Sequence, residues 1–188
     1  MNDLMFPRDV ALVIIDVQKG FRDPFWGARN NPNAEANISR ILTAWRETRR
    51  PVYHIQHLSR VPGIPLSRGA PGVEFMEEAK PLPSEPVIQK EVNSAFIGTD
   101  LEIQLRGKGI KTLIFSGLTT DHYVSTSVRM AANLGFTCFV VSDATATFDR
   151  SGPGREKYRA EDVHRMNLAS LHDEFGTVLD TEELLQKL

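Results

Sequence analysis

The sequence has little cysteine and no excess of either charge, and each shortage excludes a class of protein. Among 188 residues the only cysteine is Cys138, so no internal disulfide can form. The clustered Cys and His residues typical of zinc sites are also lacking. We therefore predict no metal and a reducing, cytoplasmic location. With 22 Lys+Arg against 24 Asp+Glu, the formal net charge of −2 argues against a nucleic-acid partner.

Long apolar runs are lacking as well. No run approaches the roughly 18 residues that a membrane-spanning helix needs, and Met1–Arg8 does not have the pattern of a targeting signal. We expect no membrane partner. A composition of 41% hydrophobic and 24% charged residues is that of an ordinary globular protein. The length suits a single domain, predicted over residues 1–188, with a sizeable core.

Short apolar runs alternate with helical patterns along the chain. The run Val10–Ile15 is continuous, as expected of a strand buried on both faces, and Asp16 follows it directly. This alternation predicts an α/β fold with helices on both faces of a parallel sheet. The other predicted strands lie at Val52–His57, Val87–Ile88, Thr112–Phe115, Phe136–Val141 and Thr177–Leu179.

Capping signals mark the starts of several predicted helices. Asn31-Pro32 supplies a cap and a first-turn proline, and Thr99–Glu102 and Asp180–Glu183 both fit a capping box. Further helices are predicted over Val124–Leu134 and Arg155–His172. The proline-rich stretch 59–86 is predicted to be a folded loop over the sheet edge.

Polar residues follow the predicted strands at five places: Asp16, His57, Lys90, the turn Gly117–Asp121 and Asp143. Ligands of open parallel sheets bind outside the carboxyl ends of the strands, so these residues are expected along one edge. A carboxylate facing a lysine there can move a proton between substrate and solvent. A purely structural pair, with Asp16 capping a turn and Lys90 reaching solvent, fits the same positions.

The turn from Gly117 to Tyr123 is a strand-to-helix entry. Free main-chain N–H groups at such an entry favour an oxyanion, which makes Leu118, Thr119 and Thr120 candidates for an oxyanion site. The alternative is that Thr119, Thr120 and Asp121 are ordinary helix caps, and the two roles do not exclude each other.

Other signals indicate no metal or cofactor. His54 and His57 are three positions apart on a strand, so their side chains should point to opposite faces. The dinucleotide, Walker and G-x-S-x-G patterns are missing from their required contexts. Cys138 lies among apolar neighbours in mid-strand, which favours a core role. We predict that no cofactor is used.

Taken together, the motifs resemble those of the isochorismatase-like (cysteine hydrolase) superfamily, in order and spacing across almost the whole chain. They are Asp16-Val-Gln18, Lys90 with Asn93–Asp100, Gly117–Asp121 and Val141–Ala144. The resemblance implies a three-layer, doubly wound, six-stranded parallel sheet in the order 3-2-1-4-5-6, in homodimers or homotetramers. It also implies a hydrolase of small amides, carbamoyl compounds or vinyl ethers.

The resemblance further assigns roles to single residues. Asp16 matches the superfamily's general acid/base and Lys90 its partnering cation. Leu118-Thr119 matches a peptide bond that members often hold cis at the oxyanion hole. At the position of the nucleophilic cysteine this sequence has Tyr123.

Three interpretations of Tyr123 follow. In the first, hydrolysis proceeds without covalent catalysis, with Asp16 moving protons while water attacks. In the second, the Tyr123 hydroxyl is drawn toward ionisation by Lys90 and acts as donor, acid or nucleophile. In the third, the ring fills the pocket, and the protein is a silent pseudoenzyme or binds a small ligand. A cysteine amidohydrolase with a substituted nucleophile is a further alternative.

Several side chains near the strand ends are predicted to contact a small-molecule substrate. The aromatic ones could instead pack beneath their own loops, and Asn93 could be a simple turn residue. The predicted set is Gln18, Phe21, Phe25, Trp26, His57, Asn93 and Phe96.

Overall fold

The computed structural model describes residues 5–188, so part of the Met1–Arg8 segment lies outside the described residues. The strands are β1 (Ala11–Ile15), β2 (Val52–His57), β3 (Val87–Lys90), β4 (Thr112–Leu118), β5 (Thr137–Ala146), β6 (Arg150–Ser151), β7 (Lys157–Tyr158) and β8 (Thr177–Leu179). The α-helices are α1 (Ala34–Glu47), α2 (Leu101–Gly107), α3 (Ser125–Asn133), α4 (Ala160–Leu171) and α5 (Thr181–Leu185). Short helical segments are η1 (Lys19–Arg22), η2 (Pro24–Trp26), η3 (Pro71–Val73), η4 (Glu77–Ala79) and the π-helical η5 (Thr120–Val124).

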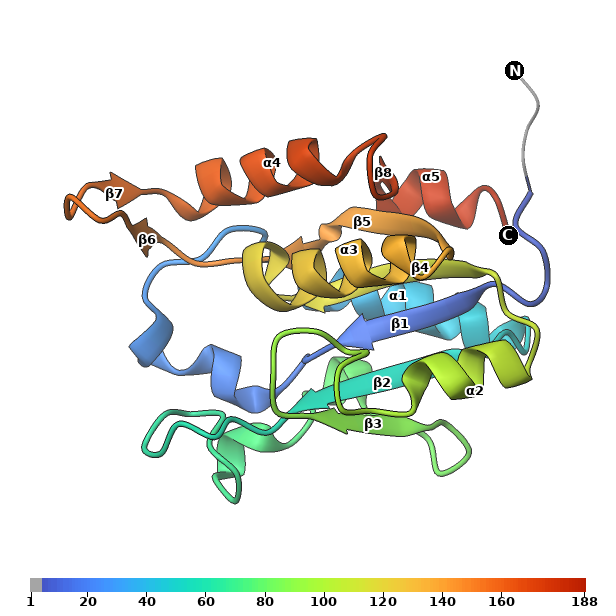
Figure 1. The fold of residues 1–188 in the computed structure, drawn as a ribbon, viewed down its shortest axis with the longest axis horizontal. Coiled ribbons are helices and arrows are strands. Elements are labelled where there is room, and N and C mark those ends of the chain that lie inside the picture. The colour runs from blue at the N-terminus through green and yellow to red at the C-terminus, as the bar shows by residue number, and fades with distance from the viewer. Residues whose placement is uncertain (1–4) are drawn as a thin grey trace.

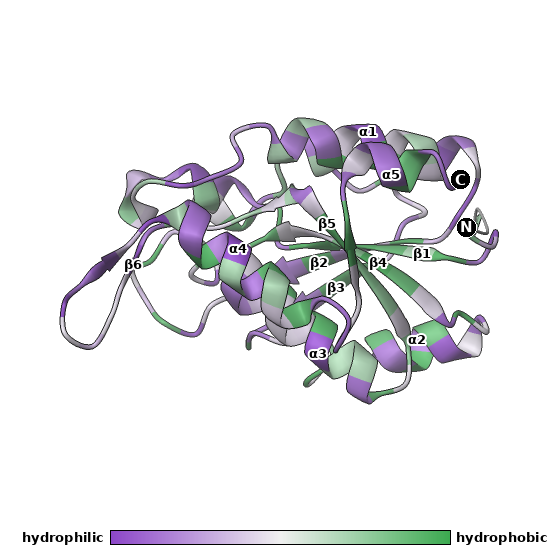
Figure 2. Cartoon of the chain, turned by 90° about the horizontal axis from the view of Figure 1, so that it is seen from above, coloured by the Kyte–Doolittle hydropathy of each residue, from purple (hydrophilic) through white to green (hydrophobic). Residues whose placement is uncertain are grey.

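A six-stranded parallel sheet in the order β3-β2-β1-β4-β5-β8 forms the centre of the fold (Figure 1). Helices α1 and α5 cover one face, and α2 and α3 lie on the other (Figure 2). The predicted α/β class and doubly wound order are confirmed. The sixth strand of the sheet is β8, because β6 and β7 pair with each other as a separate antiparallel hairpin.

Burial follows the apolar patterns of the sequence. Every residue of central strand β1 is buried, whereas edge strand β3 alternates exposed and buried residues. Helix α1 buries Ile38, Ile41, Leu42 and Trp45, and Trp45 also donates from Nε1 to the Val10 carbonyl at 3.2 Å. Each large apolar side chain buried in this way stabilises the fold by roughly 1.5–3 kcal/mol.

The predicted starts of helices α1 and α2 are wrong. Helix α1 begins at Ala34, because Asn31 has a left-handed backbone (φ 43) and donates its side-chain amide to the Ser142 and Thr145 carbonyls. The capping box predicted at Thr99–Glu102 does not form: Asp100 is the N-cap and makes no capping side-chain bond.

Helix α4 also begins later than predicted, at Ala160 rather than Arg155. The preceding residues form the β6–β7 hairpin, and the Asp149 carboxylate accepts from the Ala160 N–H at 2.7 Å, which fixes the helix start there. The capping box at Asp180 and Glu183 is confirmed. Of the helices within residues 5–188, none combines the length and apolar character needed to cross a membrane.

Candidate active site

Asp16 and Lys90 meet at the carboxyl ends of the strands. Asp16 follows β1 and Lys90 ends β3, and the two strands flank β2 (Figure 1). Lys90 Nζ lies 2.5 Å from Asp16 Oδ2, and both side chains are fully buried. The Asp16 backbone is left-handed (φ 50), a conformation that few residues other than glycine adopt and that often marks functional positions. The predicted contact between these residues is confirmed.

The second carboxylate oxygen of Asp16 is uncommitted. Oδ1 is buried and makes no hydrogen bond to any described residue. A buried oxygen without a partner is costly in a purely structural ion pair, by roughly 1–3 kcal/mol. The free oxygen therefore favours a chemical role for Asp16 over a structural one.

Burial shifts the pKa values of this pair in opposite directions. Burial raises the pKa of Asp16 to about 6, although the charge and hydrogen bond of Lys90 oppose the shift. Burial likewise lowers the pKa of Lys90, and Asp16 opposes that change. A carboxyl group with a pKa near 6 can both accept and return a proton near neutral pH.

Tyr123 packs the face of its ring on Lys90. The ring centroid lies 4.4 Å from Lys90 Nζ and 4.9 Å from the His57 ring, and Tyr123 is 9% exposed. Burial, followed by the charge of Asp16, raises the pKa of Tyr123 to about 12. The expectation that Lys90 draws the hydroxyl toward ionisation is therefore wrong, because the cation faces the ring and burial disfavours the phenolate.

The turn before Tyr123 has the geometry expected of a strand-to-helix entry. The Leu118-Thr119 peptide bond is cis, as the resemblance implies. At Gly117 (φ 116) a Cβ would lie 2.0 Å from the Ile15 carbonyl oxygen, so only glycine lets β4 run this close to β1. Thr119 is the N-cap of η5 and makes no capping side-chain bond, so the alternative capping role does not apply to it.

Two interactions that the sequence analysis missed hold this turn. The Thr120 hydroxyl lies 2.9 Å from Nδ1 of buried His164. Asp121 is paired with Arg150 (2.7 Å from Nε) and also accepts from the Thr147 hydroxyl. His164 is packed inside the fold. No sequence signal links these residues, because their partners are distant along the chain.

Gln18 connects the end of β1 to the end of β2 through hydrogen bonds. Its Nε2 donates to the carbonyls of His57 (3.0 Å) and Val73 (2.9 Å), and its Oε1 accepts from the His57 N–H (2.8 Å). The amide is fully used, so the structure gives Gln18 a positioning role near the site instead of a free substrate contact.

The predicted aromatic residues divide into two groups. The Phe21 ring is buried 6.1 Å from Tyr123 and 5.1 Å from Trp26, and both Phe21 and Trp26 pack on Phe148. By contrast, Phe25 is 59% exposed and touches the edge of Trp26. Phe21 and Trp26 therefore lie beside the site, and Phe25 lies outside it.

Three further predicted residues make no hydrogen bond or ion pair with Asp16 or Lys90. Asn93 is exposed, and Phe96 packs against Phe136 at a centroid distance of 6.1 Å. Asp143 lies inside β5, which is longer than predicted, and its Oδ1 accepts from the N–H and hydroxyl of Thr181 at the start of α5. The expectation that Asp143 ends a strand at the same edge is wrong.

The predicted divergence of the two strand histidines is confirmed. His54 Nε2 lies 2.8 Å from Glu85, whereas His57 Nδ1 lies 3.3 Å from Lys90 Nζ. Burial, followed by the charge of Lys90, lowers the pKa of His57 to about 4, so its ring is neutral at neutral pH. Across residues 5–188, no cluster of three His, Cys, Asp or Glu side chains is arranged to bind a metal ion.

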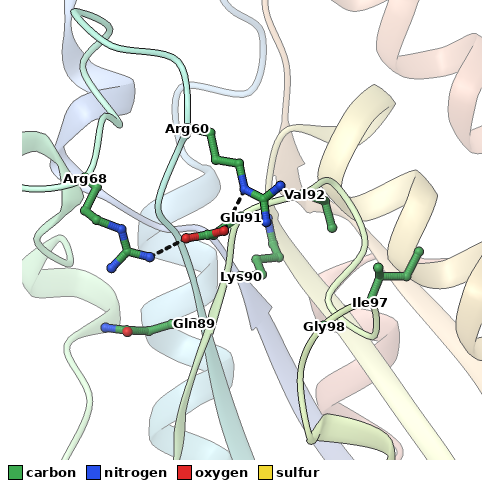
Figure 3. Close-up of a pocket in the computed structure, with 8 residues that line it drawn as sticks. All are labelled: Arg60, Arg68, Gln89, Lys90, Glu91, Val92, Ile97 and Gly98. Carbon is green, nitrogen blue, oxygen red and sulfur yellow. Dashed lines mark hydrogen bonds and ion pairs between the residues drawn. The ribbon is translucent and has the colours of Figure 1, made fainter.

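A cavity of about 310 Å³ lies at the end of β3 (Figure 3). Arg60 and Arg68 both bind the Glu91 carboxylate on its wall, with Arg60 Nε 2.6 Å from Glu91. Lys90 lines this cavity, but Asp16 and Tyr123 do not. The Lys90 side chain is fully buried, so this cavity contacts only the main chain of Lys90, while the Tyr123 ring packs on Nζ.

Together, the doubly wound sheet and the buried acid–lysine pair at its strand ends define an α/β protein with an enzyme-like site. The isochorismatase domain family matches residues 10–183. YrdC, an uncharacterised isochorismatase family protein of Bacillus subtilis, is 47% identical over 175 residues, which cover 93% of this chain and 94% of that protein. The chain belongs to the isochorismatase family of hydrolases.

Two other comparisons fit this assignment. A crystal structure of an isochorismatase family protein from Chromobacterium violaceum has a TM-score of 0.94 and 40% identity, covering 98% of this chain and 96% of that one. The ureidoacrylate amidohydrolase RutB of Methylobacterium radiotolerans is 30% identical over 93% of this chain and 77% of its own length.

Proposed function

We propose that this protein hydrolyses a small molecule at an amide or carbamoyl C–N bond or a vinyl ether, with Asp16 as acid/base and water as the nucleophile. The observation that carries the proposal is the buried Asp16–Lys90 pair with Asp16 Oδ1 free. The similarity to an amidohydrolase supports the C–N alternative. The proposal takes Tyr123 to occupy the position of the family's nucleophilic cysteine.

For a C–N bond the proton balance is simple. Asp16 Oδ1 takes a proton from water as the water oxygen adds to the carbonyl carbon. The resulting oxyanion accepts hydrogen bonds from main-chain N–H groups at the start of η5, where Thr120 and Asp121 lack helical acceptors. Protonated Asp16 then gives the proton to the leaving nitrogen, the C–N bond breaks, and Lys90 again faces a carboxylate.

For a vinyl ether, the first step is protonation of the terminal alkene carbon by neutral Asp16. Water adds to the resulting oxocarbenium ion, and the adduct collapses to a carbonyl compound and an alcohol as the proton returns to Asp16. The raised pKa of Asp16, about 6, suits this order of steps as well.

One observation favours a second candidate, a binding protein without turnover. The Tyr123 ring packs on Lys90 and Asp16 is wholly buried, so a substrate reaches Oδ1 only after part of the site moves. A bulky side chain in this position is what a pseudoenzyme would carry.

A turnover screen separates the candidates. The unmodified protein, Tyr123→Cys and Asp16→Asn are compared for ammonia release from small amides and carbamoyl compounds and for loss of a vinyl ether. Turnover by the unmodified protein that Asp16→Asn abolishes supports cysteine-independent hydrolysis. Amide hydrolysis by Tyr123→Cys alone would instead indicate an amidohydrolase whose nucleophile has been replaced.

A further inference from the structure

A second cavity lies at the opposite edge of the sheet, where the strands begin. It has a volume of about 260 Å³ and lies between the end of α1, the start of β2, the turn before β3 and the turn after α2. Four cationic side chains line it, those of Arg46, Arg49, Arg50 and Lys108, with the single carboxylate of Glu85. This local excess of positive charge contrasts with the formal net charge of −2 of the whole chain.

The one carboxylate is already neutralised. Arg46 binds Glu85 with two parallel hydrogen bonds, Nε to Oε1 at 2.7 Å and Nη2 to Oε2 at 2.8 Å. The buried His54 ring and the Leu82 N–H also bind Oε2. Because Glu85 is paired with Arg46, the charges of Arg49, Arg50 and Lys108 are not balanced by a carboxylate of the cavity.

Arg50 is nine-tenths buried and has only main-chain acceptors. It donates to main-chain oxygens of Phe6, Pro7 and Leu188, the last residue of the sequence, and its Nε has no hydrogen-bond partner among residues 5–188. Burial, followed by repulsion from Arg8, lowers the pKa of Arg50, and Asp9 only partly offsets this. Because no Asp or Glu side chain is bound to Arg50, its charge adds to the positive potential at the cavity that it lines.

Arg49 and Lys108 are exposed at the cavity, and neither forms an ion pair with a described carboxylate. Lys108 Nζ lies 5.2 Å from the centroid of the Tyr53 ring, whose buried hydroxyl also lacks a partner among residues 5–188. The planar donors of arginine and the point charge of lysine are the groups that bind phosphate oxygens.

We propose that this cavity binds a small phosphate-type oxyanion, either free phosphate or the phosphoryl group of a small molecule. Its modest volume favours a small ligand over a polymer. The site is separate from Asp16 and Lys90, since the lengths of β2 and β3 set the two edges roughly 13–17 Å apart.

The test is calorimetric titration of the purified full chain with sodium phosphate and with glycerol phosphate, at constant ionic strength. Arg49→Gln/Lys108→Gln removes two exposed cations from the cavity. Arg165→Gln/Lys157→Gln removes two exposed cations elsewhere and is the matched control. We expect saturable binding that the first double variant weakens at least tenfold and the control changes less than twofold.

Amide chemical shifts locate the bound ion. Phosphate is expected to shift the Arg49 and Lys108 signals and to leave Lys90 unaffected. Tighter binding of glycerol phosphate than of phosphate would identify a phosphomonoester as the ligand, and the reverse would identify the free ion. Absence of saturable binding, or equal weakening in both double variants, would overturn the proposal.

Discussion

Asp16 has one oxygen bound to Lys90 and one oxygen free, so its replacement by asparagine tests the chemistry directly. Asp16→Asn keeps the shape but removes the acid/base, and we expect kcat/KM to fall at least roughly 100-fold. The variant also leaves Lys90 buried without a counter-charge, so its folding must be checked by circular dichroism.

Asp143→Asn is the matched control for that experiment. Asp143 is also a carboxylate of the sheet, in β5. It accepts hydrogen bonds from Thr181 and Asn37 and has no contact with Lys90. Its activity per folded molecule is expected to change by less than about threefold. Equal losses in the two variants would remove Asp16 from the mechanism.

The pH dependence of C–N hydrolysis follows from the pKa of Asp16, which burial raises to about 6. As a general base, Asp16 must be ionised in the free enzyme, and the ionised fraction grows as the pH rises through 6. We therefore expect kcat/KM to rise with pH, with a midpoint near 6, and then to level off. Activity that instead falls above pH 6 would make Asp16 the acid, as the vinyl ether chemistry requires.

Tyr123→Phe separates the hydroxyl from the ring. Burial raises the pKa of Tyr123 to about 12, so the hydroxyl stays protonated and has little nucleophilic character at neutral pH. We expect turnover of the Phe variant to stay within about threefold of the unmodified protein, measured as kcat at saturating substrate. A loss above roughly 100-fold would assign the hydroxyl a role as donor or acid.

The sequence predicted the two charged residues of the site but not their supports. Asp16 and Lys90 could be found because each follows an apolar run, and strand ends of a parallel sheet converge. Thr120 and His164 are 44 positions apart, and Arg150 reaches Asp121 from the hairpin. Such contacts depend on how helices and loops dock, which local sequence patterns do not encode.

Among the helices and strands, too, some features could be predicted from local sequence and others could not. The apolar runs predicted the six sheet strands, and the signal is strongest for β1, whose sequence is continuously apolar because the strand is buried on both faces. The start of α4 was missed because the Asp149 side chain fixes it from outside the helix. The length of β5 was missed because its last residues include Ser142 and Asp143, whose polarity indicated a strand end.

Glu85 joins three segments of the fold, so its replacement should lower the stability of the protein. Its carboxylate binds Arg46 of α1, His54 of β2 and the Leu82 N–H of the proline-rich loop. We expect Glu85→Gln to lower the free energy of unfolding at pH 7 by about 2 kcal/mol, measured by urea denaturation.

The pH dependence of that difference has a definite sign. Burial works against the charge of Glu85, but its hydrogen bonds to Arg46, Leu82 and His54 lower its pKa to about 2. A depressed carboxyl pKa stabilises the fold at pH above the unfolded value, near 4.5, and the benefit is lost as the pH falls toward 2. The difference in the free energy of unfolding between the unmodified protein and Glu85→Gln should therefore become smaller below pH 4.5. A difference that is constant from pH 7 to 3 would mean that the charge of Glu85 contributes nothing.

The predicted single domain and homo-oligomer are both open to test by thermal unfolding. One contiguous apolar cluster joins residues from both faces of the sheet, from Phe6 through β1 to Leu184. With one core, we expect a single transition in which the calorimetric and van't Hoff enthalpies agree. Two separate transitions would instead indicate independently folding parts.

The same transition reports association. If copies of the chain bind one another when folded and separate when unfolded, mass action raises Tm with protein concentration. A homodimer or homotetramer therefore predicts a Tm that increases over a hundredfold concentration range, with a matching mass in light scattering. A constant Tm together with the mass of one chain would reject the predicted oligomer, and it would require the site at the ends of β1 and β3 to work within a single copy.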